Sequence, residues 1–305
     1  MDLNLIRVMV AVYETRSLTM AGERLFVTQS AISQALGRLR NQFDDALFVR
    51  VGREMQPTPL ADSVFVDFRA ALARVEQALD SVHGFQPSDS ERVFRIALSE
   101  LGEIGWLPAI HAAVRAEAPR ARVDVVPLET DRLAEWLDRG SVDLAVTPSD
   151  LPLEYERSPV KQENYRVLMS ATNRLADGDM TIERYQHAVH AAVTSDSGAH
   201  LLEAAQRHAG AAIIPRVTVQ HFATLPRLIA ESDELVVTIP TAIAMGWAST
   251  WPIVIKKLPF EMAPIELNLY RRRTTQGTGA LNWFYSTVAR AIQGSAGEFS
   301  AIRVG

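Results

Sequence analysis

One stretch near the amino end, residues 17–40 (SLTMAGERLFVTQSAISQALGRLR), constrains the fold of this chain most. Its apolar residues recur at the three- and four-residue steps of a helix. The β-branched pair Val27 and Thr28 interrupts that pattern and weakens a helix there. Thr28 is also a good N-cap for a second helix. The stretch therefore predicts two short helices joined by a tight turn, a helix-turn-helix.

The second of these helices has two different faces. Its apolar face consists of Ala31, Ile32, Ala35, Leu36 and Leu39. The opposite face is small and polar and carries Thr28, Gln29, Ser30, Ser33, Gln34 and Arg38. Such a face suits a DNA major groove, because Gln pairs bidentately with adenine, Ser donates or accepts, and Arg neutralises a phosphate. A solvated helical hairpin is the alternative interpretation.

A strand at residues 47–51 and a turn at Gly52 follow, flanked by the basic pair Arg50 and Arg53, as in a wing. In order, the first sixty residues contain Ala21-x-x-Leu25, Thr28-Gln29-Ser30-Ala31-Ile32-Ser33, Leu36-x-x-Leu39, Leu47-Phe48-x-Arg50 and Pro57-Thr58-Pro59-Leu60-Ala61. This series resembles the winged helix-turn-helix of LysR-type transcriptional regulators. The resemblance implies DNA contacts from the second helix, from Arg50 and Arg53, and from Thr58.

Charge limits the extent of any DNA contact. The 305-residue chain is 48% hydrophobic and 22% charged, ordinary for a globular protein with room for two domains. Its net charge of −5 argues against a surface that coats nucleic acid throughout. Residues 16–57 carry six basic and four acidic side chains, a local balance of only +2. That modest charge disfavours tight binding by a single copy.

The chain has no cysteine, so it has neither a disulfide framework nor a thiolate zinc site. Residues 1–16 reach Glu14 and Arg16 after a short apolar run, unlike a secretory signal. They predict a first helix with one apolar face, formed by Leu3, Ile6, Val10 and Tyr13.

Residues 235–255 carry no charge and are long enough to span a bilayer. Pro240 and Pro252 interrupt them, however, and β-branched residues dominate both ends. We expect a buried strand, a helix with Thr241 as N-cap, and a second strand. The protein is therefore expected to be cytoplasmic, without a membrane span.

A long helix is predicted from its N-cap Thr58, through Pro59 at the first helical position, to about His83. One apolar stripe runs along it, formed by Leu60, Val64, Phe68, Ala71, Leu72, Val75, Leu79 and Val82. The stripe favours pairing with a second copy, which would double the phosphate contacts. Packing on its own domain is the alternative. Residues 84–92 (GFQPSDSER) follow as a hinge.

Strands and helices alternate from Val93, which predicts a parallel sheet with strands near residues 93–99, 122–129 and 142–149. The pattern restarts at Tyr165 and continues to about residue 266. A strand at residues 266–274 would return to the first subdomain, and a last helix covers residues 280–292. Ligands of open α/β sheets bind beyond the carboxyl ends of the strands, here Ser99, Glu100, Glu129, Thr130, Thr147 and Pro148. A helix N-terminus after Ser99 would favour an anion.

The LysR resemblance extends over most of the chain through Ser99-x-x-Gly102-Glu103, Leu107-Pro108, residues 142–145 (VDLA), His221-Phe222 and residues 235–240. It implies an effector domain resembling periplasmic binding proteins. By analogy with branches that answer to small aromatic acids, it implies a small organic acid bound by Ser99, Glu100, Thr147, Ser195 and His208. Two departures concern the effector. Relatives commonly carry His-Pro near Asn173-Arg174, and Trp-His where this chain has Arg271-Arg272.

No catalytic constellation is recognisable. The elbow G-x-S-x-G is absent, and residues 194–198 (TSDSG) indicate a loop or N-cap. His187 and His190 lie in a strand-like run and would point to opposite faces, which excludes a shared metal. Residues 277–279 (GTG) lack the third glycine of a dinucleotide loop and predict a turn, and residues 271–273 a solvated strand end.

The sequence thus predicts an α/β protein with three parts. These are a winged helix-turn-helix at residues 1–57, a dimerising linker helix and hinge at 58–92, and an effector-binding domain at 93–305, with subdomain I at 93–164 and 267–300 and subdomain II at 165–266. We expect a transcriptional regulator, not an enzyme, without cofactor or metal. Its expected partners are double-stranded DNA, a small-molecule effector, RNA polymerase and further copies in a dimer of dimers. The alternative is a solute-binding or enzymatic α/β protein that its N-terminal helices dimerise.

Overall fold

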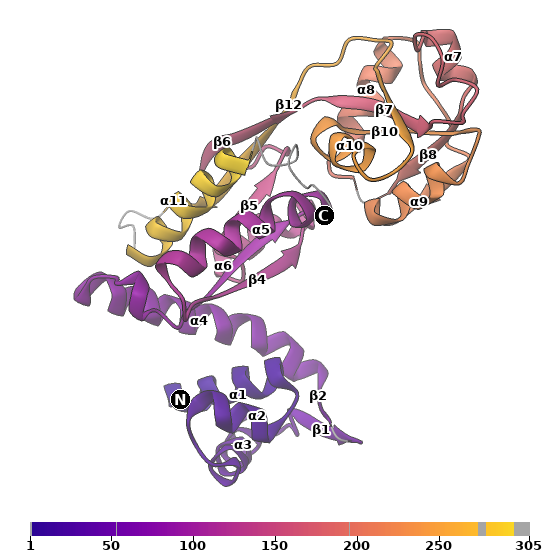
Figure 1. The fold of residues 1–305 in the computed structure, drawn as a ribbon. Coiled ribbons are helices and arrows are strands. Elements are labelled where there is room, and N and C mark those ends of the chain that lie inside the picture. Colours follow the sequence, from indigo (N-terminus) through magenta and orange to yellow (C-terminus); the bar gives the residue numbers. More distant parts are fainter. Residues whose placement is uncertain (1, 53, 195, 274–278, 296–305) are drawn as a thin grey trace. The chain divides into compact units, whose positions relative to one another are not determined.

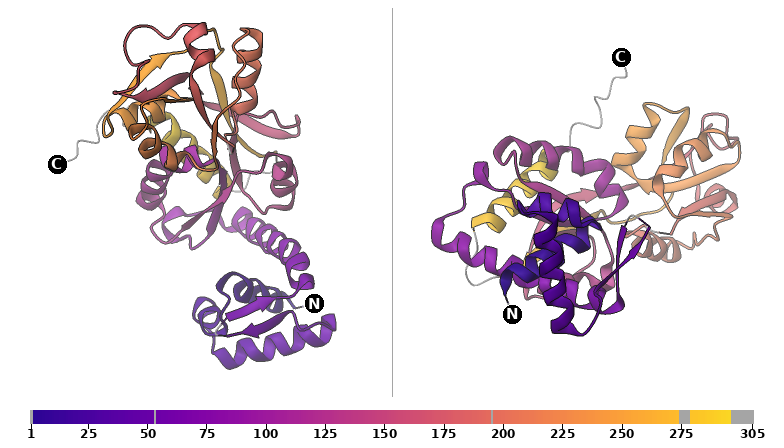
Figure 2. Two further views of the ribbon diagram at one scale, coloured as in Figure 1. Left: turned by 90° about the vertical axis from the view of Figure 1, so that its right-hand side faces the viewer. Right: turned by 90° about the horizontal axis from the view of Figure 1, so that it is seen from below.

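The computed structural model describes residues 2–52, 54–194, 196–273 and 279–295. They form two compact units, the first built mainly from residues 1–85. That unit contains the predicted helix-turn-helix and wing (Figure 1, Figure 2). Its elements are α1 (Leu3–Thr15), α2 (Leu18–Leu25), α3 (Gln29–Phe43), the antiparallel strands β1 (Phe48–Val51) and β2 (Glu54–Pro57), and α4 (Pro59–His83).

Side-chain caps fix the starts of α2 and α3. The Ser17 hydroxyl accepts a hydrogen bond from the Met20 N–H (3.4 Å), and the Thr28 hydroxyl accepts one from the Ala31 N–H (3.2 Å). Helix α2 ends at Phe26, whose φ of 56° is left-handed. The predicted cap Thr28 is confirmed.

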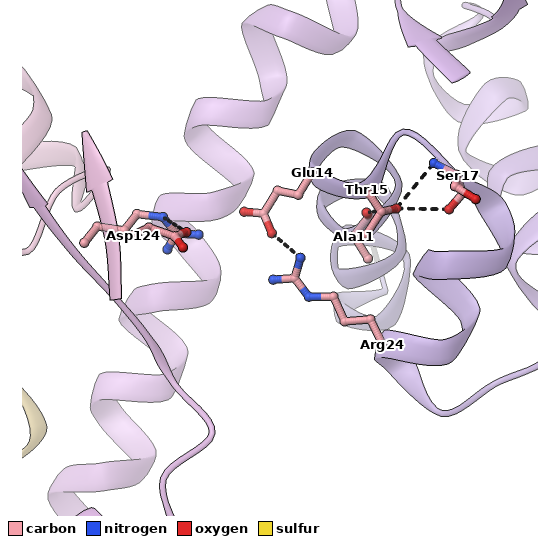
Figure 3. A network of polar contacts seen from close by, with 7 residues as sticks. Ala11, Glu14, Thr15, Ser17, Arg24 and Asp124 are labelled. Carbon is pink, nitrogen blue, oxygen red and sulfur yellow. Dashed lines mark hydrogen bonds and ion pairs between the residues drawn. The ribbon is translucent and has the colours of Figure 1, made fainter. Parts of the chain in front are cut away.

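Helices α1 and α2 are also joined by polar contacts (Figure 3). Glu14 in α1 pairs with Arg24 in α2 at 2.5 Å. The Thr15 hydroxyl donates to the Ala11 carbonyl (2.7 Å) and lies 3.0 Å from the Ser17 carbonyl. These contacts satisfy polar groups at the end of α1 and at the start of α2. They hold the two helices that precede α3 in a fixed arrangement.

The core of this unit centres on Ile32, Leu36 and Leu39 of α3, which are almost completely buried. Two details of the predicted faces are wrong. Ala31 is exposed, because it lies at the margin of the stripe formed by those three residues. Helix α1 does not present Leu3 and Ile6 to the core; its face inside the core cluster is formed by Leu5, Val8, Met9, Ala11 and Val12.

Helix α4 begins as predicted, with the Thr58 hydroxyl accepting from the Ala61 N–H at 3.2 Å. Its first half packs on its own domain. The Phe65 ring stacks on Tyr13 of α1 with centroids 3.7 Å apart. Leu60, Val64 and Phe68 pack against the same core cluster. The predicted stripe is therefore not wholly available to a second copy. Leu79 and Val82 lie outside the described side chains.

The second unit contains a lobe built on the sheet β4-β3-β5-β12-β6 (Figure 1). Its strands are β3 (Val93–Leu98), β4 (Arg122–Pro127), β5 (Leu144–Thr147), β6 (Tyr155–Glu163) and β12 (Ile265–Arg272). Its helical elements are η1 (Pro87–Asp89), α5 (Glu100–Glu117), η2 (Thr130–Arg132) and α11 (Gly279–Gly294), whereas most of α6 (Leu133–Arg139) belongs to the first unit.

The predicted parallel arrangement of the first three strands is confirmed, but the sheet as a whole is mixed. β3 runs parallel to β4 and β5, but β12 runs antiparallel to β5 and β6. β6 was not predicted. Its buried positions, Tyr155, Val160 and Glu163, are irregularly spaced, so it lacks the strict alternation that marks a strand in sequence.

The other lobe is built on the sheet β11-β7-β10-β8-β9. Its strands are β7 (Tyr165–Ser170), β8 (Val189–Val193), β9 (Val217–Val219), β10 (Leu235–Pro240) and β11 (Ile253–Lys257). Its helical elements are α7 (Ile182–His187), α8 (Ala199–His208), η3 (Phe222–Thr224), α9 (Leu225–Ala230) and α10 (Thr241–Ala248). The chain passes between the lobes from β6 to β7 and from β11 to β12 (Figure 1).

The uncharged stretch from residue 235 to 255 forms the predicted strand, helix and strand, namely β10, α10 and β11. The predicted role of Thr241 is wrong, because Pro240 is the N-cap of α10. The Thr241 N–H and hydroxyl instead donate to the Asn164 carbonyl at 2.7 and 2.8 Å. Within the described residues, no helix is both long and apolar enough to cross a lipid bilayer.

Candidate nucleic-acid interface and effector cavity

The outer face of α3 is a polar surface open to solvent. Gln29, Ser30, Ser33, Gln34 and Arg38 are all exposed. Thr28 is exposed as well, but its hydroxyl is the cap of α3 and lies 2.8 Å from the Ser30 hydroxyl. The buried side of the same helix fixes its rotation in the domain. The polar side chains are thus held outward on a rigid element, as a reading helix requires.

Few positive charges of this domain face outward without an internal role. Arg40 donates to the carbonyls of Ala46 (2.8 Å) and Phe48 (3.0 Å) and so holds the wing in place. Arg38 is 65% exposed and lies 3.7 Å from the Asp2 carboxylate, a pair that solvent screens strongly. Arg50 is exposed in β1 and donates to the Gly52 carbonyl at 3.3 Å.

Arg53 and Thr58 are also predicted to contact DNA. Arg53 lies outside the described residues. Thr58 is partly exposed, but its hydroxyl donates to the Asp45 carboxylate (2.7 Å) and accepts from Ala61 as the cap of α4. Thr58 therefore ties the segment between α3 and β1 to the linker helix, and a contact with DNA would compete with that role.

A small cavity of about 50 Å³ lies between the two lobes of the second unit. Much of its lining follows strands at their carboxyl ends. Ser99 follows β3, Pro148 follows β5, and Asp196 follows β8. This is where the topology rule places ligands of α/β sheets. The other lining residues are mostly apolar and include Leu101, Gly105, Trp106, Glu163, Tyr165, Ser197, Gly198, Pro240, Ala242, Ile243, Ile265 and Leu267.

The polar groups of the cavity form one small network. The Tyr165 hydroxyl donates to the Asp196 carboxylate, 3.2 and 3.1 Å from its two oxygens. The Gly198 N–H donates to Asp196 Oδ1 at 2.8 Å. Burial raises the pKa of Asp196 despite these bonds and the charge of His200. Burial also raises the pKa of Tyr165, to which the carboxylates of Asp196 and Glu163 add.

Glu163 is the second carboxyl of the cavity and its side chain is only 11% exposed. Burial raises its pKa, and this is opposed by Lys161, whose Nζ lies 3.8 Å from the carboxylate, and by the backbone N–H of Ala242. Sequence reasoning missed Glu163, Tyr165 and Gly198, because they come from β6, β7 and a loop that only the fold brings together. A signal did exist for Asp196, in the TSDSG loop.

Of the predicted effector residues that the structure describes, only Ser99 lines the cavity. Its hydroxyl accepts from the Gly102 N–H at 3.3 Å as the cap of α5. Thr147 is completely buried and accepts from the Ser149 N–H at 3.1 Å. His208 is exposed at the far end of α8. The carboxylate of Glu100 bonds to backbone groups of the other lobe, and Ser195 lies outside the described residues.

The two positions at which the chain departs from its relatives have structural roles. Asn173 is buried, donates to the Leu235 carbonyl at 3.2 Å and accepts from Leu175. The Arg271 guanidinium makes two bonds to Glu156 (2.8 and 2.9 Å) and lies 4.2 Å from the Tyr285 ring centroid. The prediction that Arg271 is solvated is therefore wrong. Gly277 and Thr278 of the predicted turn lie outside the described residues.

The predicted placement of the histidine pair is also wrong. His187 ends α7 on the surface, whereas His190 is buried in β8 with its Nε2 2.6 Å from the Tyr185 carbonyl. Burial lowers the pKa of His190. Among the described residues, no group of three or more His, Asp or Glu side chains is placed to hold a metal ion.

An outward polar helix in a winged helix-turn-helix, on the same chain as a two-lobed α/β domain with a cavity, defines a DNA-binding regulator with a ligand-sensing domain. Comparison with known proteins gives the family. The model described as bacterial regulatory helix-turn-helix protein, lysR family, matches residues 3–62, and the LysR substrate binding domain matches residues 88–293. The chain belongs to the LysR family of DNA-binding transcriptional regulators.

Similar proteins cover nearly the whole chain. Nodulation protein D 2 of Rhizobium tropici is 30% identical over 272 residues, which are 87% of this chain and 84% of that protein. The probable transcriptional regulator PA0477 from Pseudomonas aeruginosa is 28% identical, with a TM-score of 0.80 over 94% of this chain and 96% of that one. Full-length CbnR in complex with its target DNA shares the fold, with a TM-score of 0.66 at 17% identity over 95% and 100% of the chains.

Proposed function

We propose that this regulator reads its operator with α3 in the major groove. The observation that carries the proposal is the exposed row of uncharged hydrogen-bonding side chains, Gln29, Ser33 and Gln34, opposite the buried Ile32, Leu36 and Leu39. Gln amides match the donor and acceptor pair of adenine, and Ser matches either kind of group. Arg38 and Arg50, one at the end of the helix and one in the wing, would contact phosphates.

Two or more copies act together in this proposal. One domain offers only a few outward cations, and phosphate contacts supply most of the affinity of such proteins, so doubling the domain raises affinity steeply. The part of α4 beyond Phe68 supplies the pairing surface, and two such dimers form the tetramer. The regulator works in the cytoplasm, where bacterial DNA lies, and contacts RNA polymerase from its operator.

A small molecule bound between the lobes regulates this DNA binding. An effector that binds one arrangement of the lobes more tightly than another shifts the population between them, and the DNA-binding pairs respond. The protein performs no catalysis in this scheme. The hydroxyl of Ser99 is engaged as a helix cap, and the Tyr165 hydroxyl donates to Asp196.

A gel-shift titration of the full chain against the DNA upstream of its own coding region tests the proposal. The parent should select that DNA over competitor, and a variant with Gln29, Ser33 and Gln34 all replaced by Ala should lose the selection. A variant with Ser63→Ala, an exposed position on α4, is the matched control. Equal selection by the parent and the triple variant would overturn the assignment of α3. No selection by any of them would favour the solute-binding or enzymatic alternative.

A further inference from the structure

The cavity between the lobes is lined by acidic and apolar groups and by no basic side chain of the described chain. It contains two carboxyls, Glu163 from one lobe and Asp196 from the other. The charges of both carboxyls raise the pKa of the Tyr165 hydroxyl. An organic anion placed there would add a third acidic group to a poorly hydrated space. The cationic groups that act on the two carboxyls, Lys161 on Glu163 (3.8 Å) and His200 on Asp196, do not line the cavity. A buried ligand anion would therefore have no direct cationic partner among the described lining residues, and burying its charge is strongly unfavourable.

The helix N-terminus that the sequence offered to an anion is already occupied. Ser99 caps the Gly102 N–H of α5, and the first turn carries the acidic residues Glu100 and Glu103. These carboxylates already interact with the positive end of the helix dipole, and their negative charges repel a further anion. The N-terminus of α5 therefore does not favour an anionic ligand.

The same groups suit a hydrogen-bond donor. Asp196 accepts from Tyr165 and Gly198, which hold its carboxylate in a fixed direction, and a carboxylate has room for further donors. Burial raises the pKa of both Asp196 and Glu163, because it disfavours their charged forms. A hydrogen bond donated by a ligand would stabilise the charged form of either carboxyl. Trp106, Ile243 and Leu267 supply an apolar wall for the rest of the ligand.

We propose that the effector is an apolar, ring-sized molecule that carries O–H or N–H donors and no negative charge, bound between Glu163 and Asp196. This inference rests on the proposed function, since it names the ligand class of the regulatory cavity. The present volume of about 50 Å³ admits a few water molecules, and a single ring needs on the order of 150 Å³. The lobes therefore have to separate to admit the ligand, which links binding to conformation.

Isothermal titration of the full chain at pH 7 with four probes of one scaffold tests the ligand class. Benzamide is a neutral donor, benzylamine a cationic donor, methyl benzoate a neutral molecule without a donor, and benzoate an anion. Benzamide or benzylamine should bind at least tenfold more tightly than both methyl benzoate and benzoate. The tighter binder of the two shows whether the donor of the effector is an uncharged group or an ammonium.

Variants test which residues cause the preference for donor probes over benzoate. Glu163→Gln and, separately, Asp196→Asn should reduce the preference for donor over benzoate at least threefold, whereas Glu203→Gln, an exposed glutamate on α8, should leave it unchanged. Ala242→Phe, which fills the cavity, should abolish donor binding. Binding of benzoate as tight as that of benzamide would overturn the ligand class alone. Failure of every probe to bind a preparation that still selects its operator would overturn the proposed sensing cavity itself.

Discussion

Glu100 Oε2, at the start of α5, accepts a hydrogen bond of 2.9 Å from the backbone N–H of Phe222 in η3 of the other lobe. Its second oxygen accepts from the N–H of Ala223 at 3.0 Å, and the His221 ring nitrogen Nδ1 lies 3.5 Å from the carboxylate. One side chain thus bridges the lobes beside the cavity. Because both bonds are charge-assisted, they favour the closed arrangement.

Removing this bridge should loosen the lobes. For Glu100→Ala we expect a loss of about 1.5–3 kcal/mol of stability in thermal or urea unfolding, since two charge-assisted bonds disappear. Glu103→Ala is the matched control, because it removes a carboxylate from the same turn of α5 without touching Phe222 or Ala223. Small-angle scattering should show a more open effector domain for Glu100→Ala only. Identical profiles for the two variants would contradict a bridging role.

Gln34 is expected to read a base. Gln34→Ala should cost about 1–3 kcal/mol of binding free energy on the operator and relax specificity at one base pair, because a bidentate contact is lost. Fluorescence anisotropy with the operator and single-base variants measures both effects. Parent-like affinity would mean that α3 lies in a different orientation on the DNA.

Arg38 is expected to contact a phosphate and carry no sequence information. Arg38→Ala should weaken binding to operator and random DNA alike and lower the slope of log K against log salt by about 1. The same titrations at several salt concentrations give that slope. A loss confined to the operator would show that Arg38 reads a base instead.

Gly198 leaves space for the Tyr165 hydroxyl. A Cβ at this position would collide with that hydroxyl and lie 3.1 Å from Ile265 Cδ1, while the φ of −94° itself permits alanine. Gly198→Ala should therefore break the bond between Tyr165 and Asp196 and cost about 1–3 kcal/mol in urea unfolding. Gly294→Ala, where a Cβ meets nothing within 4 Å, is the control and should not destabilise the protein.

Glu163 should make stability fall with rising pH. Its pKa is raised by burial above the ordinary 4.5, so the folded chain holds this proton more tightly than the unfolded chain does. The stabilisation is complete below the unfolded pKa and is lost as pH rises from about 4.5 through the folded value. Lys161 opposes the shift, and Asp196 titrates in the same cavity with the same sign.

Urea unfolding between pH 4.5 and 8 tests this linkage. Glu163→Gln should lose less stability than the parent across that range, because Gln does not ionise. Glu203→Gln, whose carboxylate is 63% exposed, should follow the parent curve. A Glu163→Gln curve parallel to that of the parent would show that the carboxyl does not titrate differently on folding.

Local sequence determined the helix-turn-helix of this protein. Thr28 begins α3 and the spacing of Ile32, Leu36 and Leu39 fixes its buried side, because caps and helical periodicity act over a few residues. Tertiary structure alone decided the cavity. Glu163 and Asp196 come from different lobes and line one cavity because the lobes pack together, and the bond between Glu100 and Phe222 likewise joins the two lobes. Such arrangements depend on contacts between residues distant in sequence, which no local pattern encodes.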